Sequence, residues 1–133
     1  MSASIKKYRI FSNAITTIRA IFPQNGGCNE LCTLPDGYTY ISIPTGTVLP
    51  TQPPEITIED VTLTPDLCSE IKSASAIAQL INARVVDQIR THYSVNDELK
   101  LLRTQPSAEF EVYNAYVEDC RAEGREQLAA LGL

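Results

Sequence analysis

The chain has 133 residues, with 11 Lys and Arg against 16 Asp and Glu, and its net charge is -5. This length suits one domain, or one small domain with an arm, and a hydrophobic share of 44% excludes a disordered polyelectrolyte. The acidic balance argues against binding to nucleic-acid phosphates, which requires clustered Lys and Arg. No apolar run approaches the roughly 20 residues that span a bilayer. The amphipathic helix faces carry balanced charge instead of a Lys/Arg-rich polar side, so no membrane partner is expected.

Residues 1–63 have the composition of extended structure. Charges are few, and the frequent Thr and Ile suit a pleated, half-buried surface. Two turn signals, Asn25-Gly26-Gly27 and Pro35-Asp36-Gly37, separate the apolar segments. The segments that favour strands are 5–11, 15–22, 38–43 and 55–63.

A proline-rich connector follows the third of these segments. Residues 44–54 read PTGTVLPTQPP, and proline fixes φ and removes backbone donors, which excludes a helix or a central strand. The stretch is predicted to be extended. It is either a plain spacer, which we favour, or a docking motif for a proline-binding domain.

From Thr64 onward the sequence changes to helical periodicity. Thr64 is a good N-cap, and Pro65 suits the first helical position, where its missing N–H costs nothing. A single long helix is predicted, ending near His92 or Tyr93. Its apolar stripe consists of Leu67, Ile71, Ala74, Ala78, Ile81, Val85 and Ile89.

Two further helices are predicted after it. Ser94 and Asp97 have the spacing of a capping box, with Asp in place of the usual Glu or Gln, and open a short helix over residues 95–103. Ser107 caps the last helix, and Gly132 is a stop signal. If the short helix acts as an elbow, the two longer helices are antiparallel neighbours.

These patterns predict an α+β protein, with a β-rich N-terminal arm or small sheet followed by a three-helix C-terminal hairpin. The predicted regions are 1–49 (β-rich), 50–63 (proline-rich connector and short strand) and 64–133 (helical). Gly124 lies on the packed face of the last helix, where it allows a close helix crossing or marks a weak point. The expected helical core is Leu67, Ile71, Ile81, Val85, Ile89, Leu99, Leu102, Phe110, Tyr113 and Val117.

No residue pattern indicates catalysis, so an enzyme is the last choice and no catalytic residue is assigned. His92 is the sole histidine and fits a helix C-terminus better than a catalytic base. The paired carboxylates lie on charged helix faces, and no glycine-rich phosphate loop occurs. No cofactor is expected.

Four cysteines remain as candidates for chemistry. Cys28 and Cys32 lie in a turn-rich segment, where a local disulfide is a candidate. Their spacing is also within the zinc range, but Cys68, Cys120 and His92 do not form a second ligand pair, so no metal site is assigned. Cys120 lies on an apolar stripe and is expected to be a buried free thiol. A cytosolic location opposes every bridge, whereas release into an oxidising medium permits them.

Residues 83–133 resemble the C-terminal region of small tail-associated proteins of bacteriophages. In that family a long helix ends in Tyr, a short capped helix ends near Leu-Leu-Arg, and an aromatic-rich final helix carries Val-x-x-Cys/Ala-Arg. The matching positions are Tyr93, Asp97, Leu101, Leu102, Arg103, Phe110, Tyr113, Tyr116, Val117 and Arg121. The resemblance does not extend to the first 63 residues.

The resemblance implies a non-enzymatic virion protein, made in the host cytoplasm and located in the phage tail. It would act in baseplate or tail-fibre attachment and assembly, in several copies, against other tail, baseplate or fibre proteins. The alternatives are a tail-fibre assembly chaperone that is absent from the mature particle, and a host regulator or antitoxin-like binding module. Aromatic residues dominate interface energetics, so the expected partner-binding residues are Tyr8, Phe11, Phe22, Tyr38 and Tyr40.

Overall fold

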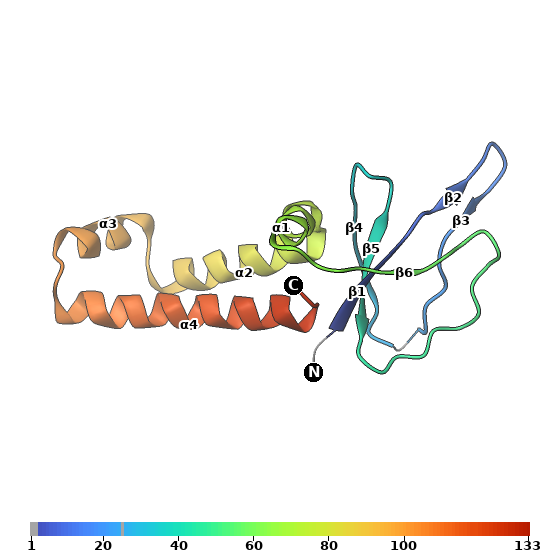
Figure 1. The fold of residues 1–133 in the computed structure, drawn as a ribbon. Coiled ribbons are helices and arrows are strands. Elements are labelled where there is room, and N and C mark those ends of the chain that lie inside the picture. Colours follow the sequence, from blue (N-terminus) through green and yellow to red (C-terminus); the bar gives the residue numbers. More distant parts are fainter. Residues whose placement is uncertain (1–2, 25) are drawn as a thin grey trace. The chain divides into compact units, whose positions relative to one another are not determined.

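The structure is a computed structural model that describes residues 3–24 and 26–133, and it has the predicted α+β class (Figure 1). Six strands precede four helices in the described residues. They are β1 (Ala3–Tyr8), β2 (Phe11–Ser12), β3 (Thr17–Ile18), β4 (Asn29–Thr33), β5 (Thr39–Pro44), β6 (Glu59–Asp60), α1 (Pro65–Ala74), α2 (Ala76–His92), α3 (Val95–Arg103) and α4 (Ala108–Ala130).

The chain divides into two compact units, which are described separately. The sheet unit comprises Met1–Gln79 together with Leu128–Leu133, and the helical unit comprises Leu80–Gln127. The sheet unit therefore includes α1, the start of α2 and the end of α4. The boundaries predicted from the sequence lie elsewhere, at residues 50 and 64 on either side of the proline-rich connector and short strand.

The sheet unit is built on a four-stranded antiparallel sheet in the order β4-β5-β1-β6. β5 pairs with β1 from Ala3↔Pro44 to Tyr8↔Thr39, and its sequence TYISIP has the β-branched and aromatic residues that suit a central strand. The predicted strand over 55–63 is reduced to the short edge strand β6. The strand predicted over 15–22 is reduced to β3, which pairs with β2 in a separate hairpin.

Successive side chains of β5 enter two different cores, because neighbouring residues of a strand point to opposite faces. Tyr40 packs on one face with Ile5 and Leu31, with Ile71 from α1, and with partly buried residues that include Leu131. Ile41 and Ile43 pack on the other face with Tyr8 and Ile56, under partly buried residues such as Ile10, Ile18, Phe22 and Leu49. Of the two predicted forms, arm or small sheet, the structure has the small sheet, and its core is covered by its own chain.

The turn-rich segment around the first two cysteines contains a strand, β4, that the sequence did not predict. The register of β4 against β5 shifts between Glu30 and Cys32, so that Leu31 is inserted as a bulge. The bulge changes which face the following residues point to. In the predicted Asn25-Gly26-Gly27 turn, Gly27 has a positive φ of 71°, which glycine adopts readily. Asn25 lies outside the described residues.

The predicted first helix is two helices. Its start is confirmed, because Thr64 Oγ1 accepts a hydrogen bond from Leu67 N at 3.2 Å. At Ser75 the backbone becomes extended (ψ 123°), and this buried residue both ends α1 and begins α2. Ser75 N donates to Ile71 O at 2.8 Å, and Ser75 Oγ accepts from Ala78 N at 3.3 Å. Two Ser residues in an Ala-rich segment were the signal for this break.

The helical unit contains the predicted hairpin, with α3 between α2 and α4 (Figure 1). Its core is formed by Ile89, Tyr113, Val117 and Cys120. Gly124 allows the close approach of the two long helices, because a Cβ at this position would lie 2.6 Å from Val85 Cγ2. This confirms the first of the two roles predicted for Gly124.

Candidate functional site

The helix α3 is held in place by local hydrogen bonds. Asp97 N donates to Ser94 Oγ at 3.1 Å, and Ser94 N donates to Asp97 Oδ2 at 3.0 Å, which is the predicted capping box. The bond from the Ser94 backbone is the main reason that the pKa of Asp97 lies below its usual value. Arg90 Nη1 lies 2.9 Å from Glu98 Oε1, so an ion pair joins α2 to α3.

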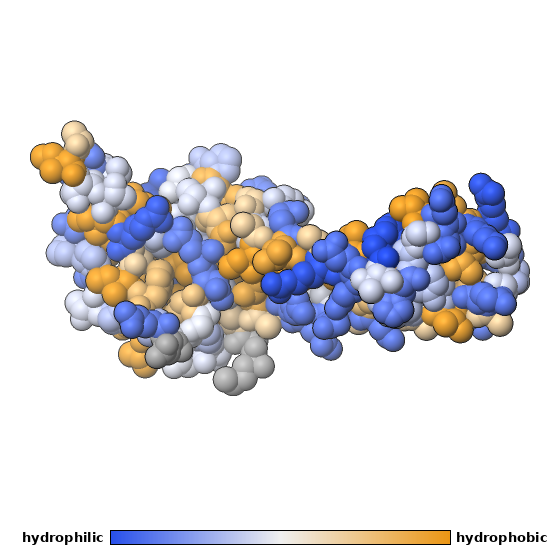
Figure 2. All heavy atoms as spheres, turned by 180° about the vertical axis from the view of Figure 1, so that it is seen from behind, coloured by the Kyte–Doolittle hydropathy of each residue, from blue (hydrophilic) through white to orange (hydrophobic). Residues whose placement is uncertain are grey.

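Although α3 is amphipathic, none of its residues is buried. Val95, Leu99 and Leu102 follow each other at helical spacing and are 54%, 49% and 49% exposed. We call these three residues the outer stripe. The prediction that Leu99 and Leu102 belong to the core is therefore wrong, since Leu101 is the leucine that packs against the helical core. Figure 2 shows hydrophobic side chains at the surface of this unit among the hydrophilic ones.

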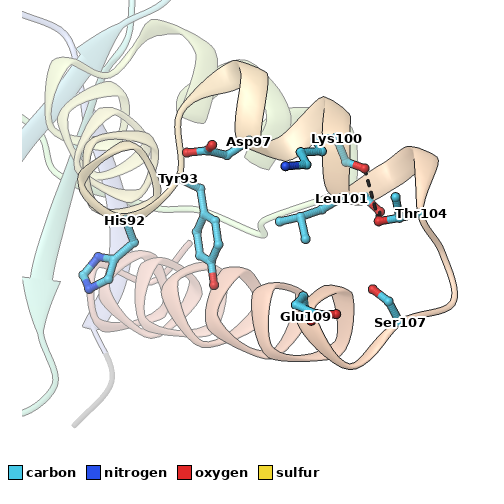
Figure 3. A pocket seen from close by; sticks show the side chains of 8 residues that line it. All are labelled: His92, Tyr93, Asp97, Lys100, Leu101, Thr104, Ser107 and Glu109. Carbon is cyan, nitrogen blue, oxygen red and sulfur yellow. Dashed lines mark hydrogen bonds between the residues drawn. The ribbon is translucent and has the colours of Figure 1, made fainter.

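On its other side, α3 does not close against α4. A hollow of about 530 Å³ lies between them, lined by His92, Tyr93, Asp97, Lys100, Leu101, Thr104, Ser107 and Glu109 (Figure 3). An adjoining hollow of about 390 Å³ is lined by Tyr93, Leu101, Ala108, Glu109 and Val112. Because the two share Tyr93, Leu101 and Glu109, we treat them together as the α3–α4 hollow. Its second part is almost wholly apolar, with one carboxylate at its edge.

An aromatic cluster adjoins this hollow through Tyr93, its one member that lines it. The rings of Tyr93 and Tyr113 meet edge to face, with centroids 4.8 Å apart, and Phe110 lies 6.0 Å from Tyr113. Burial and the neighbouring Glu98 carboxylate raise the pKa of Tyr113. Aromatic pairs of this geometry stabilise beyond their buried area by about 0.5–1.5 kcal/mol. The contact with Tyr113 therefore holds the Tyr93 ring in place, and an apolar group could pack against Tyr93 in the hollow.

His92, at the edge of the hollow, is held by Tyr116. The Tyr116 hydroxyl lies 2.8 Å from both Gln88 O and His92 Nδ1. Because a carbonyl oxygen only accepts, the hydroxyl donates to Gln88 O and accepts from Nδ1–H. Nδ1 therefore cannot act as a base toward this hydroxyl. Among residues 3–24 and 26–133, no group of three or more His, Cys, Asp or Glu side chains is placed to hold a metal ion.

The aromatic residues predicted to bind partners lie in the sheet unit, and two of them are core residues. Tyr8 is 0% exposed and Tyr40 is 2% exposed, so neither can contact a partner directly. Phe22 is partly buried at 6.5 Å from the Tyr8 ring, and Tyr38 lies beneath the Lys7 and Arg9 cations.

Only Phe11 of this set is exposed, at 37%. The prediction for Tyr8 and Tyr40 is wrong, because alternation along β1 and β5 directs each ring into a core of the same chain.

The candidate Cys28–Cys32 disulfide is not formed, and all four cysteines are free thiols. Cys28 packs in the core with Ile41, whereas Cys32 packs in the core with Tyr40, on the opposite face of the sheet. The bulge at Leu31 separates them, since four residues of regular strand would have kept both thiols on one face. Burial raises the pKa of both thiols. Cys120 is a buried free thiol, as predicted.

Neither the α3–α4 hollow nor the outer stripe was predicted as a site. The signal in the sequence was three leucines on a nine-residue helix, which is more apolar surface than one packed face requires. No helix in the described part of the chain is both long and apolar enough to cross a membrane. Comparison with known proteins gives no matching family model, no matching curated sequence and no matching solved structure.

Proposed function

We propose that this chain is a structural component of a tailed-phage particle, acting in baseplate or tail-fibre attachment through protein–protein contacts. The observation that carries the proposal is that α3 exposes an apolar stripe outside and borders an apolar hollow inside, with no buried residue of its own. A helix that packs only one side chain, Leu101, against the core stabilises its own fold little. Such a helix gains its main stabilisation when a partner covers it.

The positions that carry the resemblance to phage tail proteins coincide with this region. Tyr93 and Leu101 line the hollow, and Tyr113 and Phe110 belong to the aromatic cluster that packs behind Tyr93. The family pattern and the exposed apolar surface thus point to the same part of the helical unit. A protein-binding role accounts for both.

Mass spectrometry of purified particles, quantified against the major tail proteins, tests the proposal. Phage particles from the source are purified, digested without reduction and compared with the lysate from which they came. A fixed copy number per particle supports the structural role. Absence from particles with abundance in the lysate contradicts it and favours the assembly chaperone instead. Digestion without reduction also reports whether the thiols of Cys28 and Cys32 stay free in the particle.

A further inference from the structure

Helix α3 is attached to the rest of the helical unit by two side chains. Of its nine residues, Glu98 and Leu101 are half-buried and the other seven are exposed. Because these two residues are three positions apart, they lie on the same side of the helix. Leu101 packs against the helical core, and Figure 3 shows it pointing into the hollow between α3 and α4. One apolar residue and one charged residue therefore hold this helix against α2 and α4.

The charged residue, Glu98, contacts both of the long helices. Its Oε1 lies 2.9 Å from Arg90 Nη1 of α2, and the side chains of Arg90 and Glu98 are 39% and 20% exposed. On α4, the Tyr113 hydroxyl lies near the same carboxylate, and burial together with this carboxylate raises the pKa of Tyr113. Because the ion pair is partly exposed to water, dissolved salt weakens it.

The hydrogen bonds of α3 leave it free to move as one piece. The capping box of Ser94 and Asp97 closes one end, and Gln105 Nε2 donates to Leu102 O at 3.2 Å at the other. Within the described part of the chain, every hydrogen bond of a backbone group in residues 94–105 has both partners in that segment. Detachment of α3 from α2 and α4 therefore breaks no backbone hydrogen bond.

The space beneath α3 is incompletely packed. The hollow of about 530 Å³ separates α3 from α4 where interlocking side chains would otherwise fill the space. Leu101 packs in the same cluster as Tyr93, Phe110 and Tyr113, and Tyr113 is only 9% exposed with α3 in place. Withdrawal of Leu101 and Glu98 would therefore uncover the aromatic cluster.

We propose that α3 is a lid over the aromatic cluster, with the ion pair of Glu98 and Arg90 as its latch. The lid turns about Ser94, whose backbone is extended (ψ 167°), and about the non-helical residues 104–107. Its opening breaks one ion pair and one apolar contact, whereas unfolding of the whole unit also disrupts the buried core between α2 and α4. The lid therefore opens at a lower free energy than the unit unfolds. The apolar surface that the helical unit presents depends on whether the lid is open or closed.

Native-state hydrogen exchange of the complete chain, followed by NMR, tests the lid. Amides of residues 99–103 should exchange at least about tenfold faster than those of the core residues Ile89, Val117 and Cys120. Urea should accelerate exchange in α3 less steeply than in the core, because opening of the lid exposes less surface than unfolding. Exchange in α3 with the same rate and the same urea dependence as in the core would overturn the lid.

Two neighbouring leucines distinguish detachment of the lid from fraying of the helix in place. Leu101→Ala removes the apolar contact, whereas Leu102→Ala removes the same atoms from the outer stripe, where Leu102 is 49% exposed. The change in helix propensity is the same at both positions. Leu101→Ala should therefore speed exchange in α3 by about tenfold relative to Leu102→Ala. Equal rates in the two variants would mean that α3 frays without detaching, which contradicts the lid.

Two glutamates test the latch in the same way. Glu98→Gln removes the ion pair to α2 and should speed exchange in α3 by about two- to fivefold. Glu118→Gln removes a pair of similar exposure with Arg121, inside α4, and should leave α3 unchanged. Added salt should speed exchange in α3 of the wild type but not of Glu98→Gln. An unchanged α3 in Glu98→Gln, or an equal effect of Glu118→Gln, would overturn the latch.

A variant remote from α3 completes the test. Val85 packs beside Gly124 where α2 crosses α4, a contact that opening of the lid leaves intact. Val85→Ala should therefore speed exchange of the core amides and leave residues 99–103 at the wild-type rate. Equal acceleration of α3 and the core would mean that α3 opens only when the unit unfolds, and the lid would be wrong. The slow core amides also show in each sample that the variant is folded.

The lid depends only on contacts within this chain, so it and the virion role can fail separately. A protein present in particles at fixed copy number, but with α3 and the core exchanging together, would overturn the lid alone. A protein whose α3 opens independently, but which is absent from particles, would overturn the virion role alone.

Discussion

The sheet unit and the helical unit bury their apolar residues to very different degrees. The sheet unit has a core on each face of one sheet, and Tyr8, Ile41 and Ile71 are completely buried in it. The helical unit has one narrow core, and α3 contributes no buried side chain to it. The units therefore differ in how their elements are packed: the sheet unit leaves single residues such as Ile15 and Val48 exposed outside its two cores, whereas in the helical unit a whole helix, α3, has no buried side chain.

Core truncation should give the largest contrast between the units. Ile71→Ala is expected to lower the free energy of unfolding by about 3–4 kcal/mol, because Ile71 is fully buried beneath the sheet. Leu99 on the outer stripe is already half exposed, so Leu99→Ala should lower the free energy of unfolding by no more than about 0.5 kcal/mol. Urea denaturation followed by circular dichroism measures both. Equal losses in the two variants would mean that α3 packs as tightly as α1 in solution.

Tyr8 and Tyr40 are both buried in the sheet unit, but within the described part of the chain only the Tyr40 hydroxyl makes a hydrogen bond, so replacing each by Phe measures what that hydrogen bond contributes to stability. Tyr40 Oη donates to Asp36 Oδ2 at 2.8 Å, so Tyr40→Phe should cost about 1–2 kcal/mol. Within the described residues Tyr8 Oη has no hydrogen-bond partner, so Tyr8→Phe should change stability by less than about 0.5 kcal/mol. Parallel urea titrations compare them. A larger loss for Tyr8→Phe would contradict the assignment of the two hydroxyls.

A methyl group added at Gly124 should strain the one close crossing of the helical unit. Its Cβ would lie 2.6 Å from Val85 Cγ2, and β-branched Val85 has few alternative rotamers. Overpacking of about 1–3 kcal/mol exceeds the helix-propensity gain of about 1 kcal/mol that Ala brings. Gly124→Ala is therefore expected to lower stability by about 1 kcal/mol. The double variant with Val85→Ala should lose less than the two single losses combined, and additive losses would exclude this clash.

Acid should affect the sheet unit through Asp36. Burial acts to raise the pKa of this carboxyl, but hydrogen bonds from Tyr38 N and Tyr40 Oη, together with Lys7 and Arg9, hold it below the usual value. A lowered pKa in the folded state contributes stability above about pH 4, the pKa of a free Asp. This contribution is lost as pH falls through the folded value.

The variant Asp36→Asn lacks that pH-dependent contribution. Its thermal midpoint should therefore fall less than that of the wild type between pH 5 and pH 3, a small difference measurable by scanning calorimetry. Parallel pH profiles of the two proteins would show that Asp36 is not the group responsible.

Local signals in the sequence correctly predicted where three of the helices begin. Thr64, Ser94 and Ser107 each cap a helix as predicted, because a cap depends only on residues three positions away. Strand β4 was missed because its residues, Asn-Glu-Leu-Cys-Thr, have mixed strand preference and become a strand only by pairing with β5. The break at Ser75 was missed because one helical period fits the apolar residues on both sides of it.

The candidate site was harder to predict than the fold. On α3 the sequence offers Leu99, Leu101 and Leu102, and periodicity alone does not say which of them faces α4. The aromatic residues of the first half showed the same ambiguity, since Tyr8 and Tyr40 are equally suited to an interface and to a core. Which surface stays exposed is decided by contacts between segments far apart in the chain.

The sheet unit is discontinuous in sequence, since Leu128–Leu133 return to it after the helical unit. Leu131 and Leu133 pack in its core, and a Cβ at Gly132 would lie 2.9 Å from Ala3 O. Residues 80–127 are thus inserted between two sequence segments of the sheet unit, and every described strand of that unit comes before the insertion. Both junctions lie inside helices, α2 and α4, so a different helical hairpin that continues these two helices could be exchanged there without interrupting the sheet.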